Sequence, residues 1–130
     1  MKDLSIVIVS FNTKSILIDC IKSIIDTVKK SSYEIIVVDN NSSDGTKEAI
    51  GELKAKNLTL IENKENLGFS KGNNIGVKES KGKYVLFLNS DTVAFGNAID
   101  GMVKFMENEI SAGCATCYIE LSNGKIDDAS

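Results

Sequence analysis

Small polar side chains and carboxylates follow three of the apolar runs in this 130-residue sequence. They are Ser10 and Asn12, Asp39 and Asn41, and Asn89, Ser90 and Asp91. Asp91 could hold a divalent cation, because hard oxygen ligands suit magnesium or manganese. Asp39 belongs to the end of a strand-like run, and a carboxylate there needs either exposure in a cleft or a hydrogen-bond donor. The pattern indicates a site for a phosphorylated ligand and a metal ion.

Three glycines, Gly68, Gly72 and Gly76, recur at every fourth position, so in a helix they would share one face. A glycine inside a helix costs about 1 kcal/mol relative to alanine, which is tolerated where another group must come close. Two interpretations stay open. Either this face packs tightly on a sheet, or the segment is a nucleotide cradle whose amides, with Asn73 or Asn74, donate to phosphate or ribose.

Helix capping is an alternative explanation for two of the polar residues. Asn12 would cap a helix that starts at Thr13, and Ser43 or Asp44 would cap the next helix. Such caps stabilise a helix by about 1 kcal/mol. Asp39 lies upstream of either cap, so capping does not account for it.

The elements that must position these residues alternate along the chain. Short β-branched, apolar runs predict strands at residues 4–10, 33–39, 58–63 and 84–89. Helical spacing appears between them, first as a stripe formed by Leu17, Ile21, Ile24 and Val28, and again at residues 46–56. This order predicts an α/β fold with a mostly parallel sheet and helices on both faces. Ligands of such sheets bind outside the carboxyl ends of the strands.

Composition narrows the class of protein. Net charge is −3, with 42% hydrophobic and 25% charged residues, as in an ordinary single domain. The chain has no basic block, so we expect no nucleic-acid partner. There is no transmembrane run and no signal peptide, so we expect a cytoplasmic protein. Three cysteines fit a reducing compartment, and we expect those of the Cys114–Cys117 strand-like run to be buried, inert thiols.

Four motifs in this order, "IVIVSFN", "EIIVVDNNSSDGT", "NLGFSKGNNIG" and "VLFLNSDT", resemble the nucleotide-binding part of family 2 glycosyltransferases, and within them the rhamnosyltransferase-like subgroup. The resemblance extends from Leu4 to about Lys125. It implies the Rossmann-like GT-A fold and an inverting, hexosyltransferase-type enzyme of polysaccharide biosynthesis. The donor would be a UDP- or dTDP-linked sugar.

The resemblance also implies roles for individual residues. Asp39 would accept a hydrogen bond from the imide N–H of uracil or thymine, and Ser10 and Asn12 would line the base and ribose pocket. Asp91 would hold Mg²⁺ or Mn²⁺, and the cation would bridge the diphosphate. The other expected nucleotide contacts are Asn41, Asp44, Gly68, Phe69, Gly72, Asn73 and Asn89.

The sequence departs from the family pattern in three ways. Asn89 stands where the metal motif has its first acid. Asn73 stands where many relatives have an arginine, so more of the diphosphate charge must be neutralised by the metal or by Lys71. The general base that inversion requires is expected beyond Ser130, because no motif surrounds Asp127 or Asp128. We therefore expect residues 1–130 to be the nucleotide-sugar-binding part of a GT-A domain, with the acceptor-binding half absent.

The acceptor would be a saccharide or a lipid-linked glycan, and the full enzyme could associate peripherally with the inner face of the membrane.

Other functions fit less well. A dinucleotide-binding oxidoreductase needs a glycine-rich turn after the first strand, and "SFNTKS" has no glycine. A phosphoryl-accepting receiver domain needs an acidic pair after the first strand, and this sequence has none there. A dehalogenase-like phosphatase needs a second acid two residues beyond Asp39, where this sequence has Asn41. The main alternative that remains is a non-catalytic module that binds a nucleotide sugar.

Overall fold

The structure, a computed structural model, describes residues 1–127, and Asp128 lies outside them. Strands and helices alternate as the sequence predicts. In chain order the elements are β1 (Lys2–Ser10), α1 (Lys14–Thr27), β2 (Tyr33–Asp39), α2 (Thr46–Glu52), β3 (Leu58–Glu62), α3 (Phe69–Glu79), β4 (Gly82–Phe87) and α4 (Ala98–Asn108).

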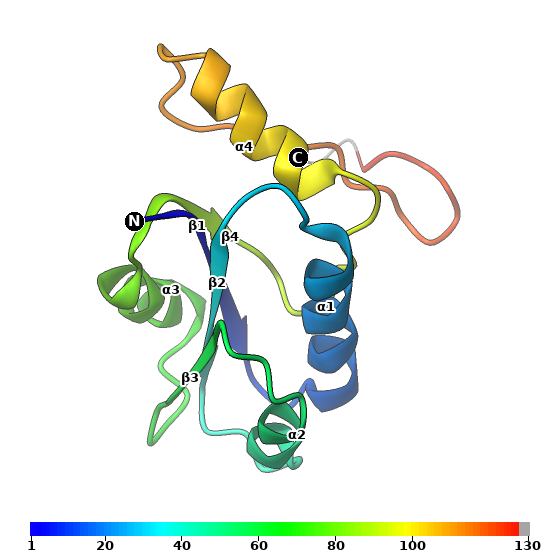
Figure 1. The fold of residues 1–130 in the computed structure, drawn as a ribbon. Coiled ribbons are helices and arrows are strands. Elements are labelled where there is room, and N and C mark those ends of the chain that lie inside the picture. Colours follow the sequence, from blue (N-terminus) through cyan, green and yellow to red (C-terminus); the bar gives the residue numbers. More distant parts are fainter. Residues whose placement is uncertain (128–130) are drawn as a thin grey trace.

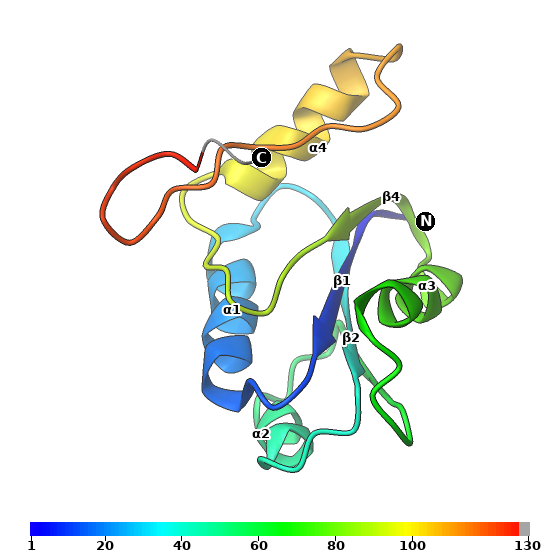
Figure 2. The same ribbon diagram turned by 180° about the vertical axis from the view of Figure 1, so that it is seen from behind.

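All four strands form one parallel sheet in the order β3-β2-β1-β4. Helices α1 and α2 cover one face of this sheet and α3 covers the other, as Figures 1 and 2 show from opposite sides. The predicted α/β fold, with a parallel sheet between two helical layers, is confirmed. Helix α4 lies near the amino ends of the strands (Figure 1). In residues 1–127 no helix has the length and apolar character needed to span a membrane.

The core lies between the sheet and α1. The predicted stripe Leu17, Ile21 and Ile24 is fully buried against Ile6, Ile8, Ile35 and Val37 of β1 and β2. Burying one such aliphatic side chain contributes about 1.5–3 kcal/mol. The burial of these apolar side chains therefore stabilises the packing of α1 on β1 and β2.

On the opposite face, α3 packs closely on β1 through its glycines. A Cβ atom at Gly72 would lie 2.8 Å from Cγ1 of Val9, and one at Gly76 would overlap Cγ1 of Val7. Both glycines are buried. The packing interpretation that the sequence left open explains these two positions, and a nucleotide contact at Gly72 stays a prediction.

The tail after α4 differs from its prediction. The run from Cys114 to Tyr118 is not a strand. The Asn123-Gly124 pair, a typical hairpin-turn sequence, does form a turn, which is closed by an isolated antiparallel bridge between Glu120 and Ile126. The expectation of buried thiols is wrong for Cys114 and Cys117, which are both exposed. The apolar run lacks a neighbouring strand to pair with, and β propensity alone does not make a strand.

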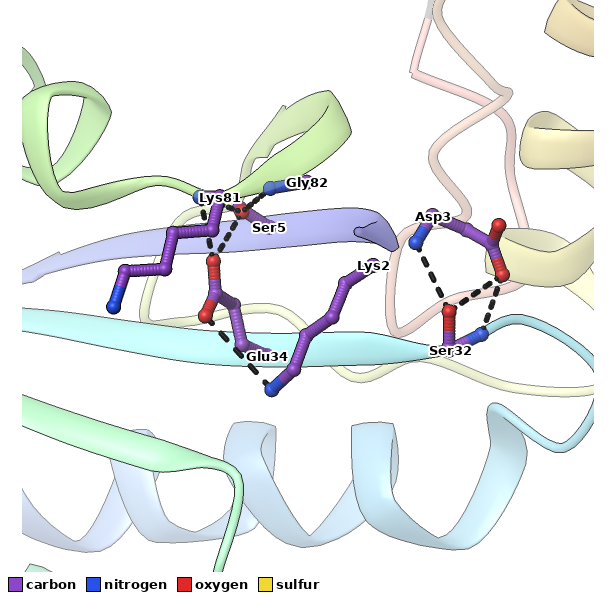
Figure 3. A network of polar contacts seen from close by, with 7 residues as sticks. All are labelled: Lys2, Asp3, Ser5, Ser32, Glu34, Lys81 and Gly82. Atoms are coloured by element: carbon purple, nitrogen blue, oxygen red, sulfur yellow. Dashed lines mark hydrogen bonds and ion pairs between the residues drawn. The ribbon is translucent and has the colours of Figure 1, made fainter.

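A polar network ties the amino ends of the strands together (Figure 3). The buried hydroxyl of Ser5 donates to Glu34 at 2.6 Å and accepts from the backbone N–H of Gly82 at 2.8 Å. Lys2 lies 3.8 Å from the same carboxylate. This amino-end network, consisting of residues 2–5, 32–34 and 81–82, joins β1, β2 and β4 at the edge opposite their carboxyl ends.

Asp100, in the first turn of α4, anchors that helix to the loop before β2. Its buried carboxylate accepts hydrogen bonds from the backbone N–H groups of Lys29, Lys30 and Ser31 at 2.9, 3.1 and 2.9 Å. Burial raises the pKa of Asp100, but these hydrogen bonds outweigh burial and lower it from 3.8 to about 2. The charged carboxylate therefore stabilises the fold.

We expect Asp100→Asn to lower the free energy of unfolding by about 2 kcal/mol at neutral pH. The folded pKa lies below the unfolded one, so the stabilisation is complete above the unfolded value of 3.8 and is lost as the pH falls toward 2. Urea unfolding of both proteins from about pH 7 to about pH 2.5 measures this. A stability difference that is the same at both ends would show that the charge of Asp100 is not its cause.

Candidate functional site

The carboxyl ends of the four strands gather polar residues at one edge of the sheet. Strand β1 lies between β2 and β4, so the order in which the chain adds strands to the sheet reverses beside β1. Such a switch point is where α/β sheets bind ligands. We call this surface the polar edge, and it consists of residues 10–13, 39–44, 63–69 and 89–92.

Asn12 joins the loop after β1 to the loop after β2. Its backbone N–H donates to the hydroxyl of Ser42 at 2.8 Å, and its side-chain oxygen accepts from the N–H of Ser43 at 2.8 Å. It has a left-handed φ of 51°, and the N-cap of α1 is Thr13. Capping by Asn12 is therefore the wrong explanation, since its side chain holds two loops together instead.

Asp44 contacts the first residues of two helices, α1 and α2. Its carboxylate accepts from the backbone N–H of Lys14 at 2.8 Å and from that of Thr46 at 3.2 Å, the first residues of α1 and α2. The hydrogen bond from the Thr46 hydroxyl holds the pKa of Asp44 below its usual value. The N-cap of α2 is Gly45, so the predicted cap at Ser43 or Asp44 is wrong, although Asp44 does accept from the first N–H group of each helix. A contact of Asp44 with a nucleotide stays a prediction.

Asp39 ends β2 with its side chain almost fully buried, at 7% exposure. One carboxylate oxygen accepts from the backbone N–H of Ser42 at 2.8 Å and the other from its hydroxyl at 2.5 Å. An ionised carboxylate offers about four acceptor positions, so Asp39 retains capacity for another donor. Ser42, which sequence reasoning did not single out, fixes the orientation of this carboxylate.

Asn40 ties the loop before α3 to β2. Its side chain, 2% exposed, donates to the carbonyl of Gly68 at 3.2 Å and accepts from Nδ2 of Asn63 at 2.8 Å. Gly68 has a φ of 83°, so its backbone conformation requires glycine. Phe69 follows with 57% of its surface exposed. Asn40 and Asn63 were not predicted as site residues from the sequence, although both directly follow a strand, which is where ligands of such sheets bind.

Hydroxyl groups link the ends of β1 and β4. The Thr13 hydroxyl lies 3.1 Å from that of Ser10 and donates to that of Ser90 at 3.3 Å. Ser10 is buried beneath the polar edge, whereas Asn12 is exposed on it. The structure thus brings the loops that carry Asn12, Asp39 and Ser90 to one place.

Three of the remaining predicted residues lie at the same edge with more exposure, and Asn73 lies beyond it within α3. Asn41 is exposed with a φ of 67°, Asn73 is half-buried on α3, and the side chains of Asn89 and Asp91 are exposed after β4. These positions agree with a surface site, and the nucleotide contacts predicted for them are not tested by the fold.

The acids of the polar edge fit a metal only in part. In the portion of the chain that the structure describes, no three acids or cysteines cluster as metal ligands would. Asp91 supplies one exposed carboxylate. Magnesium is commonly held by one or two carboxylates, with phosphate oxygens and waters completing the shell. Asp91 therefore suits a cation that a diphosphate helps to hold, and not a metal bound by the protein alone.

Two hollows lie away from the polar edge. One of about 500 Å³ separates α4 from residues 112–116, and one of about 350 Å³ lies between α2 and β3. Neither is lined by a residue of the polar edge.

Comparison with known proteins identifies the family. Residues 5–127 match the sequence profile of "Glycosyl transferase family 2". The chain belongs to glycosyltransferase family 2. It is 31% identical over 121 residues to UDP-Glc:alpha-D-GlcNAc-diphosphoundecaprenol beta-1,3-glucosyltransferase of Escherichia coli, and 36% identical over 92 residues to poly(ribitol-phosphate) beta-glucosyltransferase of Bacillus spizizenii. These matches cover 92% and 68% of this family 2 chain, but only 48% and 14% of the two relatives.

Solved structures give the same fold. Residues 1–349 of the Staphylococcus aureus protein TarS, in complex with UDP-GlcNAc, match with a TM-score of 0.76 and 23% identity over 83% of this chain and 32% of that fragment. A mannosyltransferase of Pyrobaculum calidifontis, in complex with GDP-Man and Mn²⁺, matches with a TM-score of 0.74 and 22% identity over 81% of this chain and 32% of its own. The family 2 chain therefore has the predicted GT-A fold.

Proposed function

We propose that residues 1–130 form the donor-binding part of an inverting glycosyltransferase that takes a hexose from a UDP- or dTDP-linked sugar. The observation that carries the proposal is the joining of three loops at the polar edge, by the hydrogen bonds of Asn12 with Ser42 and of Thr13 with Ser90. Within the loop after β2, Ser42 orients Asp39. A ligand at this edge would meet groups already held in place. Membership of a glycosyltransferase family supports this assignment.

Within the site, Asp39 accepts a hydrogen bond from the imide N–H of the base, and Asn12 lies beside the ribose. The backbone from Gly68 to Phe69, at the start of α3, faces the diphosphate. Asp91 would hold Mg²⁺ or Mn²⁺ together with the phosphates, and the cation, when bound, would supply the positive charge that neutralises the departing diphosphate. Lys71 is exposed on α3 and is available as a further cation.

The acceptor and the base belong to the full enzyme. A saccharide or lipid-linked glycan, delivered at the inner face of the membrane, would lose its proton to a general base outside residues 1–130. The relatives support this division, because this chain corresponds to only part of their length. The rhamnosyltransferase-like subgroup remains our proposal for the nearest functional class.

The first test is a calorimetric titration of the chain with UDP and with dTDP, each with and without Mn²⁺. We expect Mn²⁺ to raise nucleotide affinity about tenfold or more, because a cation bridging carboxylate and diphosphate adds charge-assisted contacts. Asp91→Ala should lose this increase. Mn²⁺ alone should bind weakly, since residues 1–127 offer no group of three acids or cysteines around it.

A matched control is Asp26→Ala, which removes another exposed aspartate, near the far end of α1. It should keep the full effect of Mn²⁺. If Asp91→Ala also keeps it, the cation is held elsewhere. If wild type binds neither nucleotide, the proposed donor site itself is wrong.

A further inference from the structure

Asp91 stands in a closed turn directly after β4. The backbone N–H of Thr92 donates to the carbonyl of Asn89 at 3.3 Å, and the Thr92 hydroxyl donates to the same carbonyl at 2.8 Å. Residues 89–92 therefore form a four-residue turn with Asp91 in its third position. The second bond makes this turn stiffer than its backbone alone, because it ties down the side chain of the last residue.

Helix α1 holds both ends of this segment. Figures 1 and 2 both show the connection from β4 to α4 running beside α1. The buried Cys20 thiol lies 3.8 Å from the Asn89 carbonyl and 3.8 Å from the Thr92 hydroxyl. Three residues further along α1, the Ser23 hydroxyl accepts from the N–H of Ala94 at 2.9 Å. Residues three apart share a helix face, so one face of α1 carries both contacts.

The thiol is suited to this role. Burial raises the pKa of Cys20, the hydrogen bond with Thr92 lowers it, and the negative charge of Asp91 raises it again, for a net increase from 9.0. Cys20 is therefore a neutral S–H donor near pH 7. From the other side, Thr13 donates to Ser90 at 3.3 Å. The residues on both sides of Asp91 are anchored while its own carboxylate is exposed.

We infer that Thr92, supported by Cys20 and Ser23, is a positioning residue that aims the Asp91 carboxylate at the metal–diphosphate. The inference rests on the proposed function and adds residues outside the nucleotide contacts predicted above. Asp91 is the one carboxylate in the turn of residues 89–92, so no second acid of this turn compensates when that carboxylate rotates away. Fixing the turn in advance removes the ordering cost from the binding step.

The test compares Thr92→Val, which removes the hydroxyl at nearly constant shape, with Thr92→Ser, which keeps it. UDP affinity is measured by calorimetry with and without Mn²⁺. We expect Thr92→Val to reduce the Mn²⁺-dependent gain in affinity about three- to tenfold, as the loss of one hydrogen bond would. Metal-free affinity should be unchanged, and Thr92→Ser should keep the gain. Thr59→Val makes the same change on the exposed face of β3 and should alter neither quantity.

Each other outcome is decisive. If Thr92→Val keeps the full Mn²⁺ effect, or loses metal-free and metal-dependent affinity equally, the positioning role is wrong while the donor site stands. If wild type itself shows no Mn²⁺ effect, the metal part of the proposed function fails, and the inference falls with it. Thermal unfolding of each variant without ligand confirms that the fold is retained.

Discussion

Replacing Gly76 with valine is expected to lower the free energy of unfolding by about 3 kcal/mol. A side chain at this position has no room, because even its Cβ atom would overlap Cγ1 of Val7 in the middle of β1. Both atoms belong to rigid elements, so α3 must move away from the sheet. Since α3 begins with Phe69 at the polar edge, nucleotide affinity should fall together with stability.

The matched control is Gly101→Val, the same change inside α4. Nothing lies within 4 Å of the Cβ position of Gly101. Valine and glycine differ by less than about 1 kcal/mol in helix propensity, so this variant should unfold within that margin of wild type. Urea unfolding followed by circular dichroism compares the two. Equal effects at both positions would mean that backbone entropy, and not contact with β1, explains the glycines of α3.

Replacing Asp39 with asparagine is expected to weaken UDP binding about 10- to 100-fold, because a hydrogen bond from the imide to a charged carboxylate is lost. The affinity is measured calorimetrically in the absence of metal, so that Asp91 does not contribute. Asparagine preserves the size of the side chain and can still accept from Ser42, which keeps the loop after β2 in place.

A change in the ligand provides the control. UDP methylated at the imide nitrogen cannot donate, so wild type should bind it about as weakly as Asp39→Asn binds UDP. The variant should bind both nucleotides alike. If wild type does not distinguish UDP from its methylated form, then Asp39 does not read the base and serves only to hold Ser42.

The fold could be predicted because its determinants are local. Runs of β-branched residues define β1 and β2, and the stripe of α1 occupies one helical face that becomes the core. Parallel strands then place Asn12, Asp39 and Asp91 at a common edge by geometry alone. The structure of the tail could not be predicted in the same way. The run after Cys114 has the composition of a strand, but it has no strand beside it to pair with.

The connections within the site were less accessible from sequence. Asn12 bonds to Ser43, and Asn40 bonds to Gly68, across separations of 31 and 28 residues that no local pattern records. For Gly72, sequence spacing leaves open whether a ligand or a side chain approaches. In the structure the side chain of Val9 approaches Gly72, and this contact depends on how α3 packs against β1.

The central claim is that a nucleoside diphosphate binds at the polar edge. Backbone amide signals of the isotope-labelled chain, followed by nuclear magnetic resonance during a UDP titration, test it most directly. We predict saturable shifts at residues 10–13, 39–44, 66–69 and 89–92, which extend further at the last segment when a divalent cation is added. Signals of the amino-end network should stay in place. Shifts centred on that network, or on the hollow beside α4, would contradict the account.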